Sequence, residues 1–287
     1  MQDCNGTEEE DFTSTREEVE MAVQKLKKHK DPGTDNIPAE LFKYGGDELL
    51  THLHSIIREV WLKEKMPTDW NLSLICPKHK KGDIMDCSNY RGVSLLNIAY
   101  KILSSILFMR ISPFAESTTG SYQCGFRKNR STINQIFTLR QIMEKTKEFN
   151  IETHHLFIDF RSAYDTVKRE GLYNAMSEFN IPNKLVRLTR MTMENTKNRV
   201  RIQSDLTDPI TAKNGLRQGD SLACLLFNLA LEMAVRKAGI QTNVSIFYKL
   251  VQLLAYADDI DIIARYRRAL KEAFLYSKEQ LERWVYR

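Results

Sequence analysis

The spacing of apolar residues changes several times along the chain, and it predicts a mixture of helices and strands. Helical spacing indicates helices over residues 16–28, 48–63, 98–114, 132–149, 168–179 and 222–238, a short helix after Pro38 and an amphipathic one after residue 265. Ser14 and Glu17 offer a capping box for the first helix. Strand spacing indicates strands at 72–76, 89–95 and 154–160, a hairpin of 199–203 with 209–212, and a hairpin of 253–256 with 260–263.

The last of these hairpins carries two adjacent carboxylates at its turn. Asp258 and Asp259 separate two apolar runs, and Asp261 follows within the second run, which is rich in isoleucine. Adjacent carboxylates at a hairpin tip repel each other, so a divalent cation that prefers oxygen ligands is a candidate partner. Aspartate is also a common turn residue, and a purely structural role fits this segment about equally well.

A further candidate carboxylate, Asp159, stands near the end of the predicted strand over 154–160. Strand alternation places Phe157 and Asp159 on the same face. A carboxylate in an apolar strand is costly unless it is paired or bound to metal, whereas Asp165 in the following turn fits a structural role. If this strand lies beside the hairpin, Asp159, Asp258 and Asp259 converge on a site for two Mg²⁺ ions ~3.5–4 Å apart, which suits phosphoryl or nucleotidyl transfer.

Basic residues in two segments could neutralise the charge that such a transfer develops. Lys78, Lys80 and Lys81 at a turn, with Arg91 on the returning strand, would form a positively charged finger, and a solvated lysine-rich loop is the alternative. Arg127 lies in a basic loop just before a predicted helix. Such a loop can bind phosphate at the helix N-terminus or can serve only in capping.

A glycine-flanked loop precedes the apolar helix at 222–238. Gly215 and Gly219 bracket Arg217 and Gln218, so backbone and side chains there can approach a ligand closely. The loop is a weak signal by itself, because neither a Walker sequence nor a full dinucleotide-binding pattern is present. Asp220 or Ser221 is expected to cap the helix that follows.

Composition narrows the classes of protein without choosing among them. The 287 residues hold 42 Lys and Arg against 37 Asp and Glu, and the net charge of +5 is compatible with nucleic acid but does not prove it. Apolar runs fall short of the ~20 residues of a bilayer span and the N-terminus lacks a signal-peptide pattern, so no membrane partner is expected. Five cysteines without a disulfide framework fit a reducing intracellular compartment, and Cys76, His79 and Cys87 support only a weak zinc hypothesis, because the paired Cys-x-x-Cys spacing is missing.

Five short motifs follow one another in a specific order. They are Asn89-Tyr-Arg-Gly-Val-Ser-Leu-Leu, Gln123-Cys-Gly-Phe-Arg, Phe157-Ile-Asp-Phe-Arg-Ser-Ala-Tyr-Asp, Gly215-Leu-Arg-Gln-Gly-Asp and Tyr256-Ala-Asp-Asp. With Asp31-Pro-Gly-Thr-Asp-Asn-Ile-Pro-Ala-Glu ahead of them, they resemble the reverse transcriptase domain of non-LTR (LINE-type) retrotransposons over about residues 15–270. Each motif alone is modest, and the shared order carries the resemblance.

The resemblance implies an α+β fold of the right-hand polymerase type, with an antiparallel palm sheet packed on helices. It implies a helical extension over 1–70, fingers over 71–150 and a palm over 151–287, with the thumb missing. Asp159 and Asp258 would be the principal metal ligands, with Asp259 beside them, for two Mg²⁺ ions that Mn²⁺ could replace. The implied nucleotide-binding residues are Lys78, Arg91, Tyr164 as a steric gate against a ribose 2′-hydroxyl, Gln218 and Gly219. Arg127 would support the template or the fold of the fingers, and Arg217 would lie at the template.

The expected activity is RNA-directed DNA synthesis, in which dNTPs are added to a DNA primer on an RNA template. The resemblance places it inside the cell, in the nucleus, although no targeting signal is seen. Thr34 and Asn36 stand where the family usually has Pro and Gly. The thumb, an N-terminal endonuclease and a C-terminal Cys/His domain are expected to be missing, which would weaken the hold on the duplex.

Two other hypotheses remain open from the sequence. The first is a nucleic-acid-binding remnant of such an element, without catalytic activity. The second is another palm-type enzyme, such as a nucleotide cyclase. The loop at 217–219 and Tyr164 argue against a cyclase, because it needs neither template contact nor a ribose gate.

Overall fold

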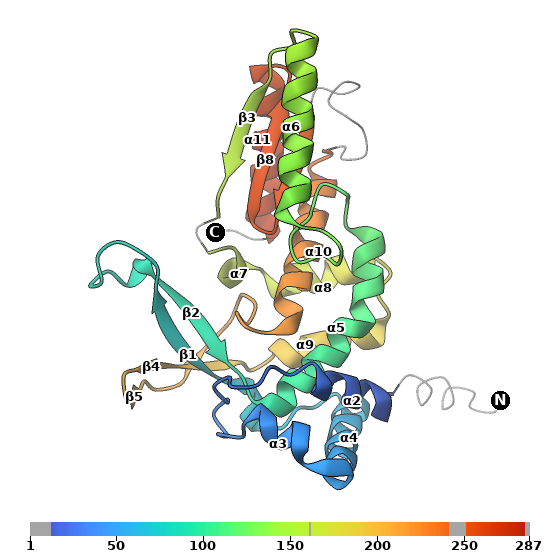
Figure 1. The fold of residues 1–287 in the computed structure, drawn as a ribbon, viewed down its shortest axis with the longest axis vertical. Helices are drawn as coiled ribbons and strands as arrows, with labels where there is room; N and C mark the ends of the chain where they lie inside the picture. Colours follow the sequence, from blue (N-terminus) through green and yellow to red (C-terminus); the bar gives the residue numbers. More distant parts are fainter. Residues whose placement is uncertain (1–12, 161, 241–250, 285–287) are drawn as a thin grey trace, which may run out of the picture. The chain divides into compact units, whose positions relative to one another are not determined.

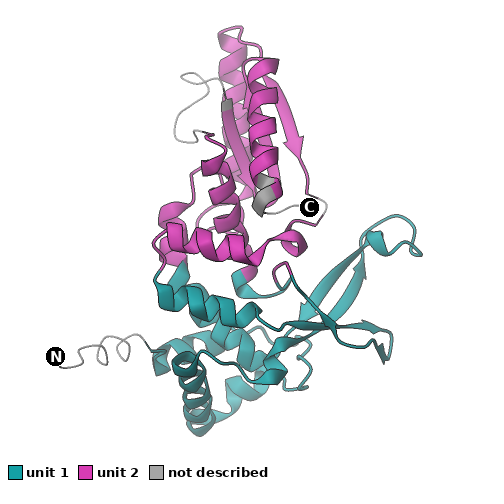
Figure 2. Ribbon diagram, turned by 180° about the vertical axis from the view of Figure 1, so that it is seen from behind, with its two compact units in different colours: residues 1–111, 182–213, 217–222 teal, residues 112–181, 214–216, 223–287 magenta. Residues whose placement is uncertain are grey.

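The computed structural model describes residues 13–160, 162–240 and 251–284, which form two compact units (Figures 1 and 2). Unit 1 comprises residues 1–111, 182–213 and 217–222, and unit 2 comprises residues 112–181, 214–216 and 223–287. Both units are therefore assembled from segments that lie far apart in the sequence. Cys4, one of the five cysteines, and Arg161, within the motif that begins at Phe157, lie outside the described residues. The expected division into extension, fingers and palm remains a prediction.

Unit 1 is built on a five-stranded sheet with the order β2-β1-β4-β5, and β6 pairs with β4 as well. Its strands are β1 (Leu72–His79), β2 (Tyr90–Leu95), β4 (Lys197–Ile202), β5 (Asp205–Leu206) and β6 (Ile210–Thr211). β1 and β2 form the predicted antiparallel hairpin, and the register sets Lys78 opposite Arg91. β4 pairs with β6, as the predicted hairpin required, but through Lys197 and Asn198, just before the predicted strand. Its parallel pairing with β1 was not predicted.

Helices provide much of the buried core of unit 1. They are α2 (Arg16–Gln24), α3 (Ala39–Tyr44), α4 (Gly46–Lys63), α9 (Asn183–Met193) and the first part of α5 (Ile98–Thr118). Apolar residues at helical spacing bury one face of α4, where Ile57 and Trp61 are fully buried. Arg110 of α5 stacks on the Trp61 ring and forms an ion pair with Glu18 of α2, which ties the three helices together.

Unit 2 contains a three-stranded antiparallel sheet with the order β3-β8-β7. Its elements are α6 (Thr132–Glu148), β3 (His154–Ile158), α7 (Ala163–Thr166), α8 (Arg169–Glu178), most of α10 (Ser221–Lys237), β7 (Val251–Tyr256), β8 (Asp259–Ala264) and α11 (Arg267–Trp284). α6 packs Ile142 against Leu254 of β7 and Ile263 of β8, while α11 contacts all three strands. β8 is the central strand, and it is buried on both faces, with Ile260 and Ile262 on one face and Ile263 on the other.

Three features differ from the sequence predictions. The capping box of α2 is formed by Thr15 and Glu18, because Ser14 is buried and Thr15 is left to accept the Glu18 N–H. Helix α9 was not predicted, and its alternation of basic or hydroxyl side chains with leucine and methionine obscures its apolar face. β3 was expected to be buried on at least one face, but its residues are only half-buried or exposed, because it is an edge strand.

Helix α5 passes a simple test for a membrane span. It is 21 residues long, with a mean hydropathy of 1.3 in its most apolar window, so it could cross a bilayer by length and composition. This does not contradict the sequence expectation, which concerned uninterrupted apolar runs, because Lys101 and Arg110 interrupt the apolar sequence of the helix. Its residues Ile102, Leu103 and Ile106 are fully buried within unit 1, however, and the core helix of a folded domain passes the same test.

Candidate functional site

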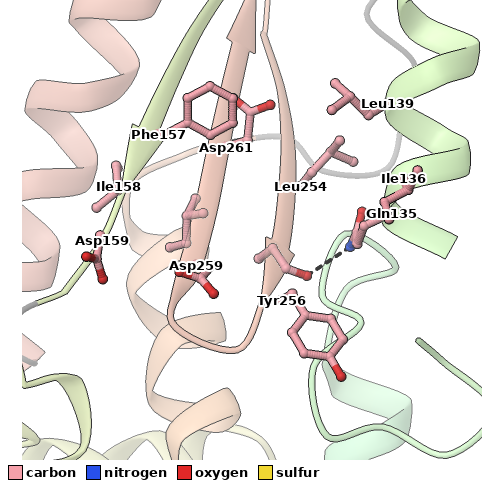
Figure 3. Close-up of a pocket in the computed structure, with 12 residues that line it drawn as sticks. Gln135, Ile136, Leu139, Phe157, Ile158, Asp159, Leu254, Tyr256, Asp259 and Asp261 are labelled. Carbon is pink, nitrogen blue, oxygen red and sulfur yellow. Dashed lines mark hydrogen bonds between the residues drawn. The ribbon is translucent and has the colours of Figure 1, made fainter. Parts of the chain in front are cut away.

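The predicted acidic residues meet at one end of the sheet in unit 2. β3 and β8 are antiparallel neighbours, with Phe157 opposite Asp261 and Ile158 opposite Ile260. Continuing this register by one residue places Asp159 opposite Asp259, on the face of the sheet that also bears Asp261 (Figure 3). Two strands that are about a hundred residues apart in the sequence therefore deliver their carboxylates to the same place.

The hairpin that carries Asp258 turns within two residues. Tyr256 and Asp259 form its closing pair, so Ala257 and Asp258 make up the loop. Ala257 has a φ of +58°, in the left-handed region that an L-residue rarely adopts, which allows the tight reversal between two straight strands. The predicted hairpin is confirmed, with Asp258 in the loop and Asp259 as the first residue of β8.

Electrostatic repulsion acts at this tip. Partial desolvation, together with repulsion from the Asp258 and Asp159 carboxylates, raises the pKa of Asp259. The Asp159 and Asp258 carboxylates are therefore close enough to disfavour the ionised form of Asp259. The sequence had suggested that burial would make Asp159 require a positive partner. Asp159 is exposed, however, so this requirement comes from its acidic neighbours instead.

A fourth carboxylate, Asp261, lies deeper on the same face. Its Oδ2 is 3.0 Å from Nδ1 of His155 on β3, and only 8% of the residue is exposed. Burial raises the pKa of Asp261, and the hydrogen bond and charge of His155 oppose that rise in pKa. This pair was not predicted, because its partners are 106 residues apart and only the β3–β8 register brings them together.

A largely apolar pocket of about 250 Å³ adjoins the acidic residues. Ile136 and Leu139 of α6 form one wall, and Phe157 of β3 and Leu254 of β7 contribute to the rest (Figure 3). Phe157 is 72% exposed, an unusual environment for a large aromatic ring. The acidic residues therefore lie along the border of an open, largely apolar pocket.

The carboxylates fit a hard divalent cation in chemical type, since oxygen ligands and mutual repulsion both favour one. Asp159, Asp258 and Asp259 can each supply such oxygens. Within the described ranges, however, no three His, Cys, Asp or Glu side chains already form a compact metal-binding group. Cys76, His79 and Cys87 form no such group either among these described residues, so the zinc hypothesis has no structural support.

Unit 1 holds the predicted basic residues in a pocket of its own. The pocket has a volume of about 650 Å³, and Lys78, Lys80, Arg91, Gln218 and Gly219 line it. The β1–β2 hairpin supplies the cations, and the Gln218 carbonyl accepts a hydrogen bond from the Ser94 N–H at 2.8 Å, which fastens the glycine loop to β2. Five candidates from three sequence regions thus share one basic cavity.

Close backbone contact explains the glycine at the end of this loop. Gly219 has a φ of +111°, and a Cβ at this position would lie 2.8 Å from the Ser94 carbonyl oxygen. Arg91 donates from Nε to Oε1 of Gln218 at 3.3 Å. Asp220 accepts a hydrogen bond from the Leu222 N–H and so caps α10, as predicted.

The remaining predicted residues have structural partners. Tyr164 of α7 is buried and its ring lies 4.8 Å from that of Phe227. Arg217 is also buried, where it donates to the Trp70 and Asn71 carbonyl oxygens and stacks on Tyr100.

Arg127 donates to Glu116 and to the carbonyl oxygens of Gly120 and Gln123. These contacts match the alternative in which Arg127 supports the fold. Template contact by Arg127 or Arg217 stays a prediction, and it would require the side chain to leave these partners.

One residue in direct contact with the acidic turn was named above only as part of a motif. Gln123 is buried, and its side-chain amide hydrogen-bonds the backbone of Ala257. The only signal in the sequence was an amide two residues ahead of a glycine, within the motif Gln123-Cys-Gly-Phe-Arg. It could not identify the partner, which lies 134 residues further along the chain.

The fold has a counterpart among solved structures. The structure of apo telomerase from Candida tropicalis, truncated from its C-terminal domain, superposes with a TM-score of 0.54 and 14% identity, covering 80% of this chain and 53% of that one. At this identity the likeness shows the fold alone. It confirms the predicted α+β architecture of the fingers-and-palm polymerase class.

Sequence comparison then supplies the family. The model of the family "Reverse transcriptase (RNA-dependent DNA polymerase)" matches residues 77–287, and the chain therefore belongs to that family. Reverse transcriptases act on nucleic acid and in general use divalent metal ions. The predicted kinship with LINE-type elements is confirmed by named relatives.

Three relatives illustrate the match. The chain is 25% identical to the transposon TX1 uncharacterized 149 kDa protein of Xenopus laevis, over 88% of this chain and 19% of that protein. It is 26% identical to the RNA-directed DNA polymerase from mobile element jockey of Drosophila melanogaster, over 89% and 28%. It is 22% identical to the Pol polyprotein of the type-1 retrotransposable element R2 of Popillia japonica, over 85% and 34%. The chain thus spans between a fifth and a third of the length of these relatives.

Proposed function

We propose that this chain catalyses RNA-directed DNA synthesis, adding dNTPs to the 3′ end of a DNA primer on an RNA template. The observation that carries the proposal is the meeting of Asp159, Asp258 and Asp259 on neighbouring strands, within a chain of the reverse transcriptase family. The mutual repulsion that raises the pKa of Asp259 supports a role in holding divalent cations.

Asp159, Asp258 and Asp259 would hold two Mg²⁺ ions, with Mn²⁺ as a substitute. When bound, such ions activate the primer hydroxyl and neutralise the charge of the triphosphate and of the leaving pyrophosphate. The carboxylates fix where this chemistry takes place, since their strands are rigidly paired.

The basic pocket of unit 1 would receive the nucleotide. Lys78 and Arg91 would neutralise triphosphate oxygens, and Gln218 and Gly219 would present their loop to the nucleotide and template. Tyr164 would act as the gate against a ribose 2′-hydroxyl. The likeness to named RNA-directed DNA polymerases supports RNA and a DNA primer as the partners.

Primer extension by the purified full chain on an RNA template with dNTPs and Mg²⁺ tests the proposal. The double variant D258A/D259A and the single variant D159N should each abolish extension. E152Q provides a matched control, because Glu152 is an exposed acid just ahead of β3 and at the opposite end of it from Asp159.

Extension by wild type and E152Q that disappears in the acidic-site variants supports the proposal. Equal extension by D258A/D259A would refute the assigned site. Retention of RNA without extension in any variant would instead favour a nucleic-acid-binding remnant without catalytic activity, and binding that weakens steeply with salt would characterise it.

A further inference from the structure

Ala257 is buried, although its backbone N–H and C=O take no part in the hydrogen bonds between β7 and β8. Ala257 is 3% exposed and is the first residue of the two-residue loop. In such a loop the N–H and the C=O of this residue point away from the ladder between the strands. Burial without partners would cost free energy for both groups, so the turn needs a donor and an acceptor from elsewhere.

The side chain of Gln123 supplies both. Its Nε2 donates to the Ala257 carbonyl oxygen at 3.0 Å, and its Oε1 accepts from the Ala257 N–H at 2.8 Å. A carboxamide offers one donor and one acceptor side by side, as a peptide group does. Gln123 therefore acts as an extra peptide unit against the turn.

Gln123 is itself held firmly. The segment 122–125 runs parallel to β7 through a bridge between Gln123 and Ala255, in which Ala255 donates to the Tyr122 carbonyl and Cys124 donates to the Ala255 carbonyl, each at 2.9 Å. Oε1 of Gln123 also accepts from the Gly125 N–H at 2.7 Å. Only 1% of Gln123 is exposed, so its amide has little freedom to leave the turn.

Gly125 allows this segment to approach the turn. A Cβ on Gly125 would lie 2.1 Å from the Ala257 nitrogen, closer than any real contact. Asn228 of α10 donates to the Gly125 carbonyl at 2.9 Å. The turn is thus connected through Gln123 and Gly125 to a buried helix of the same unit.

The hydrogen bonds from Gln123 to Ala257 also stabilise an unusual backbone conformation of Ala257. Ala257 is an L-residue at a φ of +58°, a left-handed conformation that is unfavourable without support. Asp258 follows it immediately, so the direction of both acidic side chains depends on this conformation. Loss of the Gln123 contacts would let Ala257 relax toward negative φ and would turn Asp258 and Asp259 away from Asp159.

We propose that Gln123 is a positioning residue, which holds Ala257 left-handed so that Asp258 and Asp259 face Asp159 and can bind divalent cations together. The inference rests on the proposed function in that it assigns a purpose to the acidic site. The alternative is that Gln123 contributes only to the stability of unit 2.

The test compares three variants of the full chain with wild type. Q123L keeps the size of the side chain and removes both contacts to Ala257. A257G in the Q123L background lets the turn adopt positive φ without support. Q135L is the matched control, because Gln135 donates to the Tyr122 and Ala255 carbonyl oxygens beside the bridge and makes no hydrogen bond to Ala257 within the described part of the chain.

Mn²⁺ affinity is measured by electron paramagnetic resonance and the exchange of the Ala257 amide by hydrogen–deuterium exchange, with circular dichroism as the check of folding. Q123L should lower Mn²⁺ affinity by about 10-fold to 100-fold, the usual effect of removing a group that orients metal ligands. Its Ala257 amide should exchange faster. The added A257G should raise Mn²⁺ affinity about fivefold over Q123L, because glycine avoids the free-energy cost of a left-handed conformation at this residue. Q135L should keep the wild-type affinity.

Several results would overturn the inference: unchanged Mn²⁺ affinity in folded Q123L, failure of A257G to recover any affinity, an equal loss in Q135L, or no Mn²⁺ binding by wild type. If Q123L does not fold, Q123E replaces it, because an ionised carboxylate still accepts from the Ala257 N–H but cannot donate to its carbonyl. Mn²⁺ binding that depends on Gln123, in a chain that extends no primer, would refute the proposed function and leave this inference standing.

Discussion

The substitution G219A tests whether the glycine loop is fixed by contact with β2. An alanine would have to adopt the φ of +111° of Gly219, which costs about 1–3 kcal/mol for an L-residue. Its Cβ would also meet the Ser94 carbonyl oxygen at 2.8 Å, and relieving such an overlap costs about 1–3 kcal/mol more. The expected loss of unfolding free energy is therefore about 2–6 kcal/mol.

A second glycine separates the two contributions. Gly46 has a φ of +74°, and a Cβ there would meet nothing within 4 Å. G46A should thus show only the conformational cost, about 1–2 kcal/mol. Urea unfolding followed by tryptophan fluorescence suits both variants, since Trp61 and Trp70 are buried in unit 1 with both glycines.

The difference between the two variants decides the matter. A loss in G219A that exceeds the loss in G46A by about 1 kcal/mol or more supports the close contact with Ser94. Equal losses would refute it. Under the proposed function, G219A should also weaken dNTP binding, because Gln218 is fastened to Ser94 and lines the basic pocket beside Lys78.

Other predictions concern charged and polar groups that stabilise one unit or the other from within. Burial alone would raise the pKa of Glu64, but hydrogen bonds from Lys184 and Arg187 of α9 hold that pKa below its usual value. E64Q should therefore cost about 1 kcal/mol at pH 7, and this cost should shrink as pH falls through the lowered pKa; a loss that does not change with pH in urea unfolding would contradict it. R217K should lower the thermal midpoint by removing the two-pronged donation of Arg217 to backbone carbonyls, worth about 2–3 kcal/mol, and a wild-type midpoint would contradict the buried placement. Y122F should cost about 1–2 kcal/mol, because Tyr122 donates to the buried Glu232 carboxylate at 2.9 Å, and equal stability in urea would show that this hydrogen bond contributes nothing.

Much of the fold was determined by local pattern in the sequence. The apolar spacing of 48–63, 98–114 and 222–238 predicted α4, α5 and α10, because helical spacing persists over many residues there. The isoleucines after Asp259 predicted the hairpin of β7 and β8. The ordered motifs predicted the family, which the family model over residues 77–287 confirms.

The sequence identified the acidic residues of the candidate site but not their environment. Asp159, Asp258 and Asp259 could be named because carboxylates in apolar strands are unusual, and the pairing of β3 with β8 then brought them together. The exposure of Asp159 could not be foreseen, because it depends on β3 being an edge strand.

Only the tertiary structure decided which polar side chains support the acidic turn. The hydrogen bonds from Gln123 to Ala257 and from His155 to Asp261 join residues more than a hundred positions apart. Neither partner carries a local signal for the other, because a hydrogen bond depends on position in space and not on spacing along the chain. Helices and hairpins are local and follow from the sequence, whereas the precise support of a strained turn follows from the packing of the whole unit.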